Sequence, residues 1–133
     1  MSTSDFQSWT ADIEAELTEA LADLAAAKVD LALAQTARDA AHAEEHRVGA
    51  LLDSLASQGG AAARLFGTPQ PGLSPFLAGR REPARRAAHV AEGALTQARL
   101  HVENLERRIA NAREAISSLE TATSSAQEGV TNE

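Results

Sequence analysis

The segment Ala84–Leu119, ARRAAHVAEGALTQARLHVENLERRIANAREAISSL, decides the fold of this chain. Its small and apolar residues recur at alternating spacings of four and three positions, which keeps one face of an α-helix apolar over many turns and is typical of coiled-coil packing. We therefore expect a long helix here, and we call its apolar face the second lane. The second lane consists of Ala84, Ala88, Ala91, Leu95, Ala98, Val102, Leu105, Ile109, Ala112, Ile116 and Leu119.

The segment between Thr10 and Leu55 has the same spacing. Its apolar face, the first lane, consists of Ile13, Leu17, Ala20, Leu24, Ala27, Leu31, Ala34, Ala41, Val48, Leu52 and Leu55. Arg38 and Glu45 interrupt it at two positions. Such long side chains either extend out of a narrow seam into solvent or fix the register of the helices and meet a charged partner in an oligomer.

A segment rich in Gly and Pro separates the two lanes, so we expect the helices to fold back on each other. The predicted fold is all-α: one long antiparallel two-helix hairpin, coiled-coil-like, with an Ala-rich seam and a structured Gly/Pro loop. Within the single domain of residues 1–133, helices are expected over about 5–57 and 83–126, with a loop over 58–82 and a frayed tail over 127–133. Gly59 and Gly60 are expected to end the first helix. The predicted register places Ala20 opposite Leu119.

Composition excludes several classes of function. The net charge of −7 argues against general nucleic-acid binding, which favours a clustered basic face. The absence of cysteine excludes a disulfide framework and a thiolate metal site. Neither a membrane-spanning segment nor a signal peptide is recognisable. We therefore expect no membrane contact, and a place in the cytoplasm or inside or on an assembled particle.

One motif resembles a metal site. His42-Ala43-Glu44-Glu45-His46 matches the H-x-x-E-H pattern, which sets two histidines one helical turn apart. A catalytic zinc needs a third ligand and a cleft, and Glu92 is the only carboxylate that the predicted register brings near. His42 and His46 are therefore weak metal candidates, and we expect solvated histidines, no cofactor, no small-molecule substrate and no enzymatic activity.

The predicted loop carries candidates for partner binding. Its large apolar residues either form a local core at the end of the hairpin or dock a partner; they are Leu65, Phe66, Leu73, Phe76 and Leu77. Four arginines follow: Arg80, Arg81, Arg85 and Arg86. Residues 58–86 contain five Arg and one Glu, whereas residues 1–57 contain eleven acidic and three basic residues. The basic corner is either simply solvated or contacts an acidic surface, on a partner or on a second copy; binding of phosphate or nucleic acid is a less favoured alternative.

Lateral association between hairpins is also expected. Bulky apolar residues fall outside the lanes, on what should be outer faces; they are Phe6, Trp9, Leu21, Val29, Leu33, Val90 and Leu100. Charges of alternating sign recur every seven residues at Arg85, Glu92, Arg99, Glu106, Arg113 and Glu120. This row of charges is either solvated, satisfied within the hairpin, or paired with a second copy about a two-fold axis.

These observations favour a non-enzymatic structural or assembly protein. Such a hairpin would act as a spacer or clamp that oligomerises laterally and docks a partner through its apolar, Arg-flanked loop. A component of a larger particle, such as a phage virion or a secretion apparatus, fits this description. The alternative is an adaptor or chaperone that binds a client between or along its helices.

Overall fold

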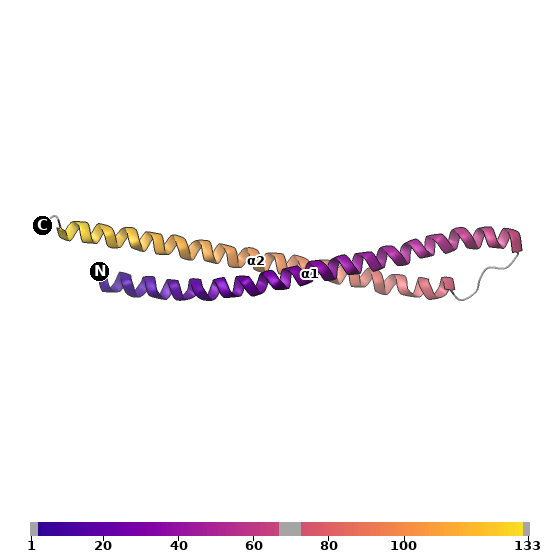
Figure 1. Cartoon of the computed structure of the whole chain (residues 1–133), viewed down its shortest axis with the longest axis horizontal. Helices are drawn as coiled ribbons and strands as arrows, with labels where there is room; N and C mark the ends of the chain where they lie inside the picture. The colour runs from indigo at the N-terminus through magenta and orange to yellow at the C-terminus, as the bar shows by residue number, and fades with distance from the viewer. Residues whose placement is uncertain (1–2, 67–72, 132–133) are drawn as a thin grey trace. The chain divides into compact units, whose positions relative to one another are not determined.

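Two α-helices make up the described part of the chain. The computed structural model describes the backbone of residues 3–66 and 73–131 and the side chains of residues 4–57 and 75–127. Helix α1 is Thr3–Phe66 and helix α2 is Leu73–Thr131. They run in opposite directions and pack against each other (Figure 1), so the predicted all-α antiparallel helical hairpin is confirmed.

The hairpin consists of two compact units. Unit 1 contains residues 1–30 and 98–133, so the first part of α1 packs there on the second part of α2. Its described core combines two alanines of α1 with three larger aliphatic residues of α2: Ala20, Ala27, Val102, Leu105 and Ile109. Because small side chains face large ones, the two helices can approach closely.

Unit 2 contains residues 31–97. Its described core residues are Val48, Leu77, Ala84, Ala88 and Leu95. Leu95, at 0% exposure, is the one large side chain that is fully buried among the described residues. A two-helix unit has a seam rather than an interior, so few of its residues can be buried completely.

Both predicted lanes form this seam. Every residue of the first lane and of the second lane is buried or partly buried. No polar or charged residue with a described side chain is buried. The alternating spacing therefore identified the packed face of each helix along its described length.

The ends of the helices differ from the prediction. Helix α1 continues through Gly59 and Gly60 to Phe66, so the expected end near Ser57 was wrong. A glycine inside a helix costs only about 1 kcal/mol relative to alanine, and three alanines, Ala61–Ala63, follow directly. Helix α2 also runs to Thr131, beyond the predicted start of a frayed tail at residue 127.

Helix α2 begins ten residues earlier than predicted, at Leu73 rather than Pro83. Pro75 lies in its first turn, where the missing N–H needs no helical acceptor. Pro83 lies inside the helix and leaves the carbonyl of Gly79 without its usual donor. Leu77 and Ala84 are buried on either side of this defect, so seam packing offsets the lost hydrogen bond. The predicted loop over 58–82 is thus mostly helical, and residues 67–72 lie outside the described part.

The register of the helices also differs from the prediction. In unit 1, Ala20 shares a groove with Arg108 and Ala112, whereas the predicted partner was Leu119. Ala112 precedes Leu119 by seven residues, which is one heptad. A slip of one heptad sets the same lane against the same lane, so apolar spacing alone does not distinguish the two registers.

Candidate functional site

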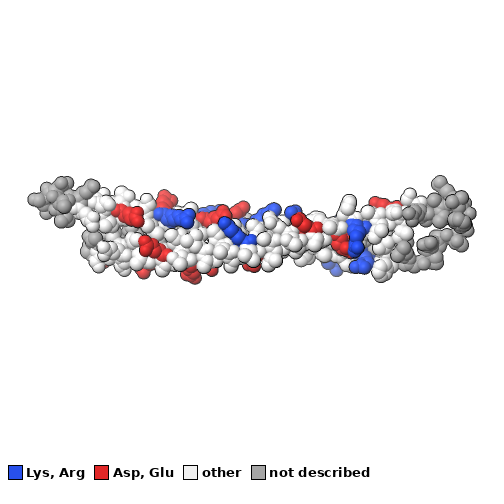
Figure 2. All heavy atoms as spheres, in the orientation of Figure 1, with Lys and Arg blue, Asp and Glu red and all other residues white. Residues whose placement is uncertain are grey.

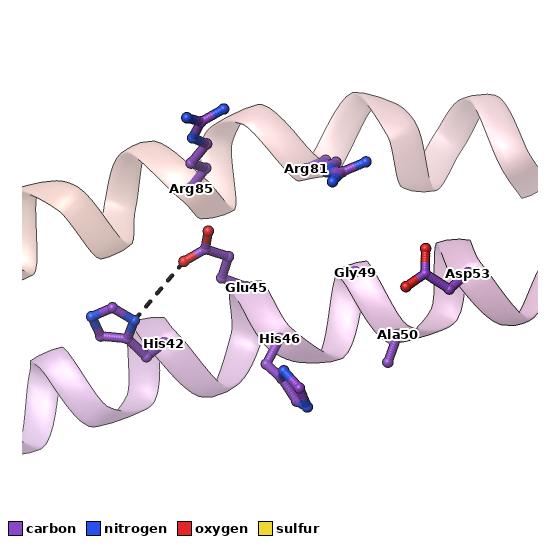
Figure 3. A pocket seen from close by; sticks show the side chains of 8 residues that line it. All are labelled: His42, Glu45, His46, Gly49, Ala50, Asp53, Arg81 and Arg85. Carbon is purple, nitrogen blue, oxygen red and sulfur yellow. Dashed lines mark ion pairs between the residues drawn. The ribbon is translucent and has the colours of Figure 1, made fainter.

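Unit 2 contains a groove of about 740 Å³ between α1 and α2, which we call the polar groove because most of its lining residues are polar or charged. Six of its lining residues come from residues 42–53 of α1 and two come from α2 (Figure 3). They are His42, Glu45, His46, Gly49, Ala50, Asp53, Arg81 and Arg85. The charged members occupy helix positions beside the seam, where long side chains reach toward the opposite helix and toward solvent.

Three side chains connect α1 and α2 beside this groove, and we call them the polar clasp: Arg38, His42 and Glu92. Nε2 of His42 lies 3.0 Å from Oε2 of Glu92, and Nη1 of Arg38 lies 3.7 Å from the same oxygen. Glu92 was expected to approach the histidines, and it does. Arg38 therefore meets a charge within the hairpin.

Neighbouring carboxylates extend the polar clasp along α1. Nδ1 of His42 lies 3.9 Å from Oε2 of Glu45, and Nε of Arg38 lies 2.9 Å from Oδ1 of Asp39. The N–H of Arg38 Nε is shielded from solvent but does not point at that oxygen, so this contact is an ion pair without a hydrogen bond. The side chains of His42 and Glu92 are 49% and 47% exposed, so each pair contributes at most about 1 kcal/mol.

The H-x-x-E-H motif does not assemble a metal centre. In Figure 3 the ring of His42 lies beside Glu45, whereas His46 points away from α2. Among the residues whose side chains are described, no group of three or more His, Cys, Asp or Glu is placed to hold a metal ion. His42 instead has a carboxylate near each of its ring nitrogens.

A second polar cluster ties the beginning of α2 to α1. Glu44 lies between two arginines, with Nη2 of Arg47 at 2.6 Å from one oxygen and Nη2 of Arg80 at 3.8 Å from the other. The guanidinium of Arg80 also lies 5.7 Å from the centre of the Phe76 ring, within the range of a cation–π contact. Arg80 is thus engaged within the hairpin.

The remaining arginines of the basic corner are more available. Nη2 of Arg86 lies 4.0 Å from Oε1 of Glu82, one turn earlier on the same helix. Arg81 and Arg85 are exposed and form no ion pair within the described part of the chain. They are the two residues of α2 that line the polar groove.

The predicted partner-binding residues therefore divide into groups. Leu77 is only 8% exposed and belongs to the seam, so its prediction as a docking residue was wrong. It packs because α2 begins early enough to carry it onto the apolar face. Phe76 is 57% exposed. The side chains of Leu65, Phe66 and Leu73 lie outside the described residues.

The predicted lateral contact residues lie at the surface. Large apolar side chains are exposed by 41–64% at Trp9, Leu21, Val29, Leu33, Val90 and Leu100, and Leu51, which sequence reasoning missed, is 45% exposed. Phe6 is partly buried and meets Trp9 edge to face, with 6.0 Å between ring centres. In the alternating charge row, Arg85, Arg99, Glu106, Arg113 and Glu120 form no ion pair with described residues.

Comparison of the chain with protein-family models, with curated proteins and with solved structures found no match. Within residues 3–66 and 73–131, neither helix contains a stretch apolar enough to cross a membrane.

Proposed function

We propose that this protein is a non-enzymatic structural or assembly protein that works by binding other protein surfaces along its helices. The observation that supports this proposal most is the exposure of large aliphatic side chains on outer faces. Leu33 and Val90 are each 64% exposed, and Val29 is 60% exposed. Contact with another helix would remove such side chains from water at about 25 cal/mol per Å² of apolar area.

The thin seam gives the same proposal a physical reason. In each unit, two helices bury only a few residues against each other, and a chain with so little core usually gains stability by association. Packing a further helix on an outer face would bury that face and give a hydrophobic core formed by more than two helices. The hairpin would then act as a spacer or clamp inside a larger assembly, such as a virion or a secretion apparatus.

Light scattering coupled to size-exclusion chromatography tests the proposal. We expect the protein to associate at micromolar concentrations, and the triple variant Val29→Gln, Leu33→Gln, Val90→Gln to associate at least tenfold more weakly. The helix propensity of glutamine is close to that of leucine and higher than that of valine. The variant should therefore keep the helical circular dichroism spectrum of the wild type. A fully helical wild type that stays monomeric at every concentration, with or without its natural partners, would contradict the proposal.

A second assay, suppression of the aggregation of an unfolded substrate, tests the alternative that the protein is an adaptor or chaperone. A client bound between the helices would have to displace Leu95 and its seam neighbours, whereas a client bound along them would use the same exposed residues as an assembly contact. Suppression of aggregation of an unfolded substrate by the monomeric protein, lost in the triple variant, would favour the client-binding function over assembly.

A further inference from the structure

We infer that the exposed arginines at the beginning of α2, Arg81 and Arg85, dock the acidic first part of α1 of a second copy of this chain. This inference rests on the proposed function and names one of its contacts. It concerns the charged surface, whereas the lateral association above concerns the apolar outer faces.

Only two of the four arginines at the beginning of α2 are available to a partner, because the other two already have partners within the chain. Arg80 faces Glu44 and Phe76, and Arg86 lies near Glu82. Arg81 and Arg85 have no ion-pair partner within the described part of the chain, although Glu45 and Asp53 line the same groove. Arg81 and Arg85, one helical turn apart, therefore remain able to bind carboxylates from outside.

The chain itself carries the complementary surface. Residues 4–30 of α1 contain seven acidic residues and one lysine. Five of the acidic residues lie along one flank of the first lane, are exposed, and form no ion pair with described residues: Asp12, Glu16, Glu19, Asp23 and Asp30. On the face drawn in Figure 2, acidic side chains lie along the first half of α1, and basic ones lie near the beginning of α2 and also further along that helix.

The spacing of the charges on the two surfaces agrees. Arg81 and Arg85 are four residues apart, as are Asp12 and Glu16, so two helices laid side by side can pair both arginines at once. Phe76 and Leu21 are exposed on the same two helices, but the helical period places them on the sides opposite the charged residues. Exposed charges contribute little free energy each, so this contact would mainly select the partner and its orientation.

This contact joins two different surfaces, so it is heterologous: the copy that contributes its arginines retains an unoccupied acidic surface, and the other copy retains an unoccupied basic surface. The experiment uses two charge-reversal variants of the full chain. One is Arg81→Glu, Arg85→Glu, and the other is Asp12→Lys, Glu16→Lys, Glu19→Lys. A variant with Arg47→Glu and Arg113→Glu is the matched control, because it changes the net charge as much as the first variant does and neither arginine lines the polar groove or the groove that contains Glu16.

Sedimentation velocity at low and at high salt provides the readout. We expect each surface variant alone to associate at least tenfold more weakly than the wild type, and the control to associate as the wild type does. An equimolar mixture of the two surface variants should again form a complex, because the unchanged surfaces of the two variants complement each other and so do the two reversed surfaces. Raising the salt from 50 to 500 mM should weaken that complex, because exposed ion pairs are screened.

Three outcomes would overturn the inference. In the first, the two surface variants do not associate when mixed. In the second, each variant alone associates as the wild type does, which leaves the proposed lateral assembly intact but removes this contact. In the third, the wild-type protein binds a DNA duplex at 150 mM salt through Arg81 and Arg85, which assigns the surface to nucleic acid. Failure of the proposed function is a separate result: it appears when the triple variant Val29→Gln, Leu33→Gln, Val90→Gln associates as strongly as the wild type.

Discussion

Replacing Leu95 with alanine should destabilise the hairpin more than the same change at any exposed leucine. Leu95 is 0% exposed, whereas Leu33, in the same unit, is 64% exposed. Leu95→Ala removes three buried carbons at about 0.8 kcal/mol each, and the space left behind adds a further cost. Because solvent borders the seam on both sides, neighbouring side chains can move inward, so we expect a total loss of about 2.5–3.5 kcal/mol.

Leu33→Ala is the matched control, since both variants make the same chemical change in a helix of the same unit. We expect it to change the free energy of unfolding by less than about 0.5 kcal/mol in the monomer, as surface substitutions usually do. Urea denaturation followed by circular dichroism at 222 nm, at a concentration where the protein is monomeric, measures both values. Equal losses from the two variants would refute the reasoning, because they would mean that the seam is not the core of unit 2.

Three further predictions concern the register and the backbone. The chain has no cysteine, so introduced cysteine pairs can report the register. Ala20→Cys combined with Ala112→Cys should form an intramolecular disulfide on mild oxidation, whereas Ala20→Cys combined with Leu119→Cys should not. The reverse pattern on a non-reducing gel would support the other heptad register. Gly93→Ala should raise the free energy of unfolding by about 0.5–1 kcal/mol, because a methyl group there meets nothing within 4 Å, and a loss in thermal denaturation would show an unseen close approach. Glu92→Gln should cost less than about 1 kcal/mol, because the polar clasp is half exposed; a larger loss in urea denaturation would mean that the clasp is shielded from water.

The candidate surfaces were only partly predictable. Exposure of Val29, Leu33 and Val90 followed from their positions outside the lanes, because residues on the far side of a packed helix face solvent. The separation of the four arginines into engaged and available residues did not follow from the sequence. It depends on which carboxylate of α1 lies opposite Arg80, and that is a property of the register.

The sequence alone determined that two helices form, which face of each is packed, and that they pair in opposite directions, because the period of the apolar residues matches the α-helix over many turns. Only the tertiary structure decided where the helices end and which heptads meet. Seam packing around Leu77 and Ala84 extends α2 through Pro83 against local propensity. The register depends on a few side chains such as Arg38 and Glu92, because a repeating apolar lane is nearly equivalent to itself after a shift of seven residues.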